Sequence, residues 1–233
     1  MQELLILVAK KSHESPLEVC GCVTRDAAHR FGFPHTSVLL VPVTWDRDRM
    51  EPVIFLHKRS PYKRISPNAW DFCGGHLTFD ESYFPEGKWD SPYDLERAMD
   101  DAAVREANEE IRCTPPFTFL PEHVRRFQPI GYFECETASE RGRNREFSSV
   151  YIVAVPPDRI VNIWDTDPEG ERQLEVRRFT WPDLLAFYQK EKDSFADGAG
   201  RILQKLSGDA KLTAGFEQVI RDVGTAMAQS TQG

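Results

Sequence analysis

The arrangement of short β-branched segments around one long helical segment most constrains the fold of this chain. Runs of about four to eight mostly apolar residues between turn-forming residues are typical of strands. Four such runs precede the helical segment, at Leu4–Val8, Val19–Val23, Ser37–Val43 and Pro52–Leu56. Three predicted strands follow it, at Arg126–Glu136, Phe147–Val155 and Glu175–Trp181. Strands on both sides of a helix predict a mixed α/β sandwich.

The helical segment itself is predicted over residues 92–112. Ser91 offers an N-cap and Pro92 a suitable first helical residue. Helical spacing also predicts three helices near the end of the chain, at Pro182–Lys190, Ala199–Leu206 and Gly215–Ala228. We therefore expect a single domain over 1–233, with a core over about 17–190 and a helical C-terminal extension over about 191–228.

Composition bears on partners and compartment. The residues are 40% hydrophobic and 28% charged, which is ordinary for a globular domain. A net charge of −8 argues against a protein that coats nucleic acid. The apolar run Leu4–Ala9 is far shorter than the roughly 20 residues of a membrane span, so we expect no membrane partner. The five cysteines lack Cys-x-x-Cys spacing and predict reduced thiols in a cytoplasmic protein.

Three glutamates gather on one side of the predicted helix. Because a helix turns by about 100° per residue, Glu106, Glu109 and Glu110 fall within an arc of roughly 100°. Clustered carboxylates suit Mg²⁺ or Mn²⁺, which in turn bind substrate phosphates. The alternative is a solvated acidic stripe paired with Arg105, since Arg105 and Glu109 are an i, i+4 pair.

The segment upstream favours the metal site. Gly74 and Gly75 follow an apolar strand, and Glu81 lies six residues beyond Gly75. Together with Arg105-Glu106-Ala107-Asn108-Glu109-Glu110, this order resembles the signature of the Nudix hydrolase family, Gly-x5-Glu-x7-Arg-Glu-U-x-Glu-Glu-x-Gly-U, in which U is apolar. The resemblance implies that Gly74, Gly75 and Glu81 shape the loop that precedes the helix.

Two departures from the signature affect the expected structure. Residues 82–104 separate Glu81 from Arg105, where the family usually has seven residues, so a 16-residue insertion is expected at about 82–97. Its aromatic residues favour an ordered lid or the interface of a homodimer, and a passive surface insertion is the alternative. Arg112 replaces the family's glycine, so the helix is expected to end without a left-handed cap.

The resemblance implies both a fold and a chemistry. The fold is a Nudix-type α/β/α sandwich with a mixed sheet, the insertion in the signature loop and a helical C-terminal tail. The chemistry is hydrolysis of a nucleoside diphosphate linked to another group. Glu106, Glu109 and Glu110 would hold Mg²⁺, with Mn²⁺ as a substitute. The catalytic residues would be Glu109 and Glu106, one of which or a loop glutamate activates water, and Arg105, which orients the helix carboxylates.

A basic loop over Lys58–Trp70 is similar to that of isopentenyl diphosphate isomerase, a branch of the same superfamily. This second resemblance covers roughly residues 4–190 and implies that Arg59 and Lys63 contact a diphosphate. The loop is the one dense basic cluster of an acidic chain and lies beside the glycine pair, so phosphate recognition is reasonable. A solvated basic loop is the alternative.

The isomerase resemblance extends to three histidines and a cysteine. It implies that His29, His35 and His76 are metal ligands and that Cys73 is the catalytic thiol. Two glycines stand where the isomerase has one, and only Glu146 matches its two acidic residues on a later strand, where it would face the substrate. These departures favour the hydrolase, in which His35 is a buried neutral side chain and Cys73 a small core residue.

Taken together, the sequence predicts a Mg²⁺-dependent hydrolase that acts on a small-molecule diphosphate. An isopentenyl diphosphate isomerase-like enzyme and a binding module that has lost turnover are the alternatives. The sequence leaves open the substrate, the role of the insertion, the oligomeric state and the identity of the general base.

Overall fold

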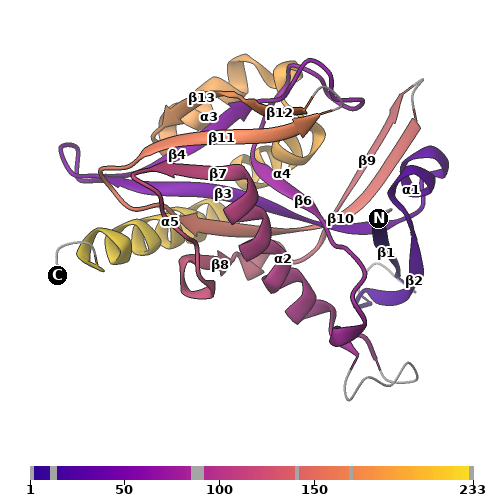
Figure 1. The fold of residues 1–233 in the computed structure, drawn as a ribbon. Helices are drawn as coiled ribbons and strands as arrows, with labels where there is room; N and C mark the ends of the chain where they lie inside the picture. The colour runs from indigo at the N-terminus through magenta and orange to yellow at the C-terminus, as the bar shows by residue number, and fades with distance from the viewer. Residues whose placement is uncertain (1–2, 11–14, 85–91, 140–141, 168–169, 231–233) are drawn as a thin grey trace.

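The structure, a computed structural model, describes residues 3–10, 15–84, 92–139, 142–167 and 170–230. Two sheets hold the described strands (Figure 1). The strands of the larger sheet are β1 (Leu4–Ala9), β2 (Glu18–Thr24), β3 (His35–Asp46), β4 (Glu51–Lys58), β5 (Trp70–Asp71), β6 (Cys73–His76), β8 (Val124–Arg126), β9 (Phe133–Ser139), β10 (Gly142–Ala154) and β13 (Glu175–Phe179). The smaller sheet contains β7 (Ile111–Thr114), β11 (Ile160–Asp167) and β12 (Gly170–Gln173).

Strand β3 is the centre of the larger sheet. It pairs in parallel with β10, from His35 opposite Glu146 to Val43 opposite Ala154. Its pairings with β1, β4 and β6 are antiparallel. The expected mixed sheet is therefore confirmed, and one end of it brings β10, β3 and β6 side by side.

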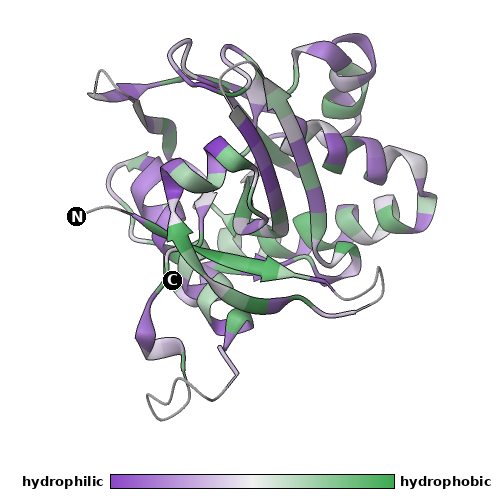
Figure 2. Cartoon of the chain, turned by 90° about the vertical axis from the view of Figure 1, so that its right-hand side faces the viewer, coloured by the Kyte–Doolittle hydropathy of each residue, from purple (hydrophilic) through white to green (hydrophobic). Residues whose placement is uncertain are grey.

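Helices cover both faces of this sheet, as expected for an α/β fold with C-terminal helices. They are α1 (Arg25–Phe31), α2 (Leu95–Glu110), α3 (Trp181–Lys190), α4 (Asp197–Gly208) and α5 (Ala210–Ser230). Because side chains alternate along a strand, Leu40 packs in the cluster that contains α2, while Val41 packs in the cluster that contains α3, α4 and α5. The strands between the two clusters are the most uniformly hydrophobic part of the molecule (Figure 2).

Helix α2 is shorter than the expected 92–112 at both ends, because it begins at Leu95 and ends at Glu110, where β7 follows. It begins at Leu95, where the Asp94 carboxylate accepts the Arg97 N–H, so the expected start at residue 92 is wrong. At its other end the Ile111 N–H bonds to the Ala107 carbonyl and the chain continues extended into β7. The expected end without a left-handed cap is confirmed, because β7 pairs directly with β11.

Two predicted strands extend too far. The strand expected over Arg126–Glu136 is interrupted, because Pro129 has no N–H for a sheet ladder and Gly131 turns the chain at a φ of 64°. The strand expected to reach Trp181 ends at Phe179. Thr180 there accepts the Asp183 N–H and caps α3.

The insertion is described only at its two ends, since residues 85–91 lie outside the described residues. The aromatic rings of these ends pack together, with 5.7 Å between the ring centroids of Tyr83 and Tyr93 and 5.2 Å between those of Phe84 and Tyr93. The Tyr83 hydroxyl donates to Asp101 on α2 at 3.0 Å. The base of the insertion is therefore held against α2, while its role as a lid or interface stays a prediction.

The described helices include none with the length and apolar composition needed to cross a membrane.

The packing of α5 yields a stability prediction. Phe216 is fully buried, and its ring centroid lies 4.8 Å from that of Trp181 and 5.4 Å from that of Phe127. We expect Phe216→Ala to lower the free energy of unfolding by about 3–5 kcal/mol, measured by chemical denaturation. Glu217→Ala, an exposed neighbour, should change it by less than about 0.5 kcal/mol. Equal effects of the two would mean that α5 is a detached extension.

Candidate functional site

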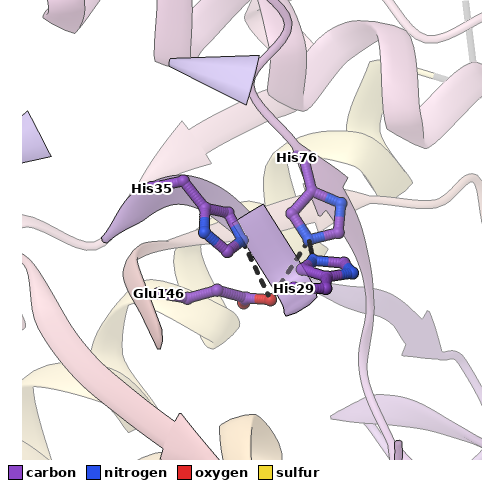
Figure 3. A group of neighbouring side chains, drawn as sticks. All are labelled: His29, His35, His76 and Glu146. Carbon is purple, nitrogen blue, oxygen red and sulfur yellow. Dashed lines mark hydrogen bonds and ion pairs between the residues drawn. The ribbon is translucent and has the colours of Figure 1, made fainter. Parts of the chain in front are cut away.

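Three histidines and a glutamate converge at the end of the sheet where β10, β3 and β6 lie side by side (Figure 3). His35 and Glu146 are paired across β3 and β10, His76 ends β6, and His29 comes from α1. One potential ligand atom from each of the four lies within 4.8 Å of the others. Among the described residues, no other group of three or more His, Cys, Asp and Glu side chains brings its potential ligand atoms this close together.

The hydrogen bonds orient these rings inward. The Nε2 of His76 lies 3.2 Å from Glu146 Oε1 and 3.3 Å from the Nε2 of His29. His35 Nδ1 lies 2.8 Å from the Phe33 carbonyl oxygen, and donation to that oxygen leaves Nε2 as the lone-pair atom. This Nε2 is buried without a hydrogen-bond partner, 3.8 Å from Glu146 Oε1. A metal ion is the kind of partner that such an atom accepts.

Burial tunes the protonation of the cluster. Burial, with a contribution from neighbouring His76, lowers the pKa of His29 to about 3 and that of His35 to about 4. Burial alone would raise the pKa of Glu146, but the hydrogen bond and charge of His76 lower it below its usual value. At neutral pH His29 and His35 are therefore uncharged and Glu146 is ionised. Imidazole nitrogens with one carboxylate fit Zn²⁺, Mn²⁺ or a similar divalent ion.

The glycine pair of β6 brings two α2 glutamates against the sheet. The Gly74 N–H donates to Glu110 Oε2 at 2.9 Å. A Cβ on Gly75 would lie 2.3 Å from the Glu106 carboxylate, and one on Gly74 would lie 2.1 Å from the Val38 carbonyl oxygen. Gly74 also has a φ of +148°, which residues with side chains rarely adopt. Only glycine fits at Gly74, where the Val38 backbone blocks a side chain, while a side chain at Gly75 would displace the Glu106 carboxylate.

Arg105 connects this carboxylate pair to the histidine cluster. Its Nη1 lies 2.8 Å from Glu106 Oε1 and 3.4 Å from Glu109 Oε2, while Nη2 donates to the His76 carbonyl at 3.1 Å. Glu109 itself is exposed, and Glu81 is exposed in a short 3₁₀ turn. The structure thus brings Glu106 and Glu110 to the glycines and leaves Glu109 and Glu81 at the surface.

Glu106 and Glu110 lie in an environment that disfavours their charge. Burial raises the pKa of Glu110 well above its usual value, and neighbouring Glu106 raises it further. Burial also raises the pKa of Glu106, against the opposing effect of Arg105. A divalent cation between two such carboxylates would relieve this penalty. The expected Mg²⁺ site at Glu106, Glu109 and Glu110 stays a prediction.

The basic loop folds back on the sheet through its cations. Arg59 donates from Nη1 to Asp71 Oδ2 at 2.7 Å and from Nη2 to the Ile65 carbonyl at 3.3 Å. The ammonium of Lys63 lies 2.7 Å from Asp165 Oδ1 on β11. The Arg59 and Lys63 side chains are only 24% and 22% exposed, whereas the cations of a fully solvated loop would be mostly exposed.

Cys73 lies apart from the histidine cluster. In the antiparallel pairing of β6 with β3, Cys73 is opposite Leu40 and His76 is opposite Ser37. Residues three apart on a strand point to opposite faces, and Cys73 accordingly packs in the apolar cluster beneath α2. Its Sγ lies 4.0 Å from His57 Nδ1, and burial raises the pKa of its thiol well above the usual value.

The sequence did not indicate two carboxylates of this region, Asp71 and Asp165. Asp71 stands alone as an acid between buried Trp70 and Phe72, and an isolated charge in an apolar run is a usable signal of a buried ion pair. Asp165 offered none, because its strand was not predicted.

Comparisons with known proteins find distant structural similarity only. No protein-family model matches the chain, and no curated protein matches it. Solved structures do match it. The Nudix domain of Shewanella oneidensis NrtR in complex with ADP ribose is 12% identical with a TM-score of 0.42, covering 74% of this chain and 86% of that one.

Two other solved structures are named Nudix hydrolases. RenU from M. smegmatis is 14% identical with a TM-score of 0.41, over 90% of this chain and 94% of that one. A protein from Alicyclobacillus acidocaldarius is 14% identical with a TM-score of 0.44, over 72% of this chain and 89% of that one. At these values the similarity assigns neither an activity nor a ligand to this chain.

The histidine cluster yields a metal-binding prediction. We expect the protein to bind Zn²⁺, and His76→Ala to weaken that binding by about 100-fold or more, because one ligand is lost and His29 and Glu146 lose their contact. Competition with a chromophoric chelator measures the affinity. His123→Gln, which changes a histidine in a 3₁₀ turn outside the cluster, is the matched control. Equal affinities of wild type and His76→Ala would contradict the site.

Proposed function

We propose that this protein is a divalent-metal-dependent hydrolase that cleaves a diphosphate linkage in a small nucleoside diphosphate-type substrate. The observation that carries the proposal is the contact of Glu106 and Glu110 with the glycine pair of β6. Gly75, Glu106 and Glu110 belong to the ordered motif that resembles the Nudix signature, and Gly74 directly precedes it. Their contact joins the two halves of that motif in space, although residues 82–104 separate them in the sequence.

The α2 side chains would have distinct tasks. Glu106, Glu109 and Glu110 would hold Mg²⁺ or Mn²⁺, which when bound neutralises the developing charge on diphosphate oxygens. The Gly74 N–H fixes Glu110, and Arg105 fixes Glu106 against the end of β6. Glu106 or Glu109 would accept the proton of the attacking water.

The remaining groups would bind the substrate and a further cation. Arg59 and Lys63 would recognise phosphate oxygens, for which charge-assisted hydrogen bonds are well suited. His29, His35, His76 and Glu146 would hold a second divalent ion. The insertion would act as a lid or as the contact of a homodimer, and the enzyme would be cytoplasmic.

One observation favours a second candidate, an isopentenyl diphosphate isomerase-like activity. The three histidines and Glu146 do meet, as that resemblance implies. The position of Cys73 opposes it, because the extra glycine places the thiol on the other face of β6 from His76. A buried thiol with a raised pKa is also a poor acid–base group.

The first functional prediction concerns Glu106. We expect Mg²⁺-dependent phosphate release from at least one class among nucleotide sugars, dinucleotides, nucleoside triphosphates and coenzyme A. Glu106→Gln should lower its rate by about 100-fold or more, since it removes a metal ligand and a proton acceptor. Glu122→Gln, at an exposed glutamate, should leave the rate unchanged. Binding of these compounds without any turnover would contradict the hydrolase and support a binding module.

The second prediction separates hydrolase from isomerase. We expect Cys73→Ala to retain hydrolysis within about threefold, because the change removes only a small buried atom. The fold is checked by circular dichroism, and isopentenyl diphosphate is tested in parallel. If the wild type isomerises it and Cys73→Ala loses that activity by orders of magnitude, the isomerase assignment is correct.

A further inference from the structure

The hairpin of β11 and β12 holds the basic loop by two contacts. Asp165 on β11 pairs with the ammonium of Lys63 at 2.7 Å, with side chains 11% and 22% exposed. Opposite Asp165 on β12 stands Arg172, whose guanidinium lies 4.7 Å from the ring centroid of Tyr62. Two neighbouring residues of the loop thus contact two paired residues of the hairpin.

The cations that the proposed function assigns to phosphate are therefore already paired with carboxylates. Arg59 contacts Asp71 at 2.7 Å in the same way as Lys63 contacts Asp165. An ammonium has three donors, so the pairing with Asp165 does not by itself keep Lys63 from contacting a phosphate. The negative charge of Asp165 nevertheless stays beside the bound anion, where partial burial weakens screening by water.

Further negative charge surrounds this pair. Glu110 interacts electrostatically with both Lys63 and Asp165, as well as with Glu106. Each of the two loop cations assigned to the substrate phosphate is thus paired with a carboxylate before any diphosphate binds.

We propose that Asp165 is a specificity-determining residue, which keeps free diphosphates out of the site so that they bind only together with a divalent cation. The proposal rests on the proposed function to the extent that Lys63 must face the substrate phosphate. Asp165 holds the loop in place through Lys63 and at the same time cancels the charge that would attract an uncomplexed anion.

Binding of inorganic pyrophosphate, measured by isothermal titration calorimetry, tests the proposal. With a chelator present, Asp165→Asn should bind pyrophosphate about tenfold or more tightly than the wild type, because asparagine keeps a hydrogen-bond acceptor but removes the charge. Glu171→Gln removes one negative charge from the same hairpin, where Glu171 pairs with Arg112, and should bind as the wild type does. With Mg²⁺ present, the difference between Asp165→Asn and wild type should shrink.

Two further variants complete the test. Lys63→Gln combined with Asp165→Asn should abolish the gain, since no ammonium is left to attract the anion. Asp165→Ser carries the same expectation as Asp165→Asn and replaces it if circular dichroism shows that the latter does not fold. The proposal is overturned if the uncharged variant, Asp165→Asn or Asp165→Ser, binds pyrophosphate without metal no more tightly than the wild type does.

The outcome is separable from that of the proposed function, because it depends on binding rather than turnover. If Asp165→Asn binds pyrophosphate more tightly without metal while the wild type hydrolyses no diphosphate, the role of Asp165 is supported and the proposed hydrolase function is contradicted. If the wild type hydrolyses a diphosphate but Asp165→Asn shows no gain in metal-free affinity, the hydrolase function is supported and the role of Asp165 is contradicted.

Discussion

The close approach of β6 to helix α2 and to strand β3 is the contact on which the rest of the site depends. Gly74 leaves no room for a side chain beneath the Val38 carbonyl, and Gly75 leaves none against Glu106. The same four-residue strand carries the contact with Glu110 at its second residue, Gly74, and the cluster residue His76 at its end. A side chain at Gly75 would displace the Glu106 carboxylate, and one at Gly74 would collide with the backbone of β3.

Much of the fold followed from local signals. The β-branched runs that became β3, β4 and β10 were predictable, since burial on both faces leaves few polar residues in such strands. The shorter runs of β1 and β2 were found by the same apolar pattern, although β2 is mostly exposed. The mixed α/β arrangement followed from the order of the predicted strands and helix along the chain, and the C-terminal helices followed from their helical spacing. The smaller sheet was missed, because β7 follows α2 without a turn and β11 carries charged and polar residues that break the apolar pattern.

The site was less predictable than the fold, because it depends on contacts between distant segments. The spacing of Glu106 and Glu110 indicated a shared helix face, and the contact with the glycines agrees with that arrangement. The three histidines were noted only through a resemblance, since nothing local connects His29 with His76. Asp165 could not be found at all, because its partner Lys63 lies in another part of the sequence and its strand was not recognised.

The histidine cluster also ties any bound ion to the formation of the native topology. Its donors come from a helix, from two strands paired in parallel across most of the domain, and from the short glycine strand. No local stretch of the unfolded chain holds more than two of them, His29 and His35, so an ion would gain its full coordination only after β3, β6 and β10 have assembled. The ion would therefore bind the folded state much more tightly than the unfolded state. Its binding would stabilise the fold, and thermal stability would rise with the ion's concentration.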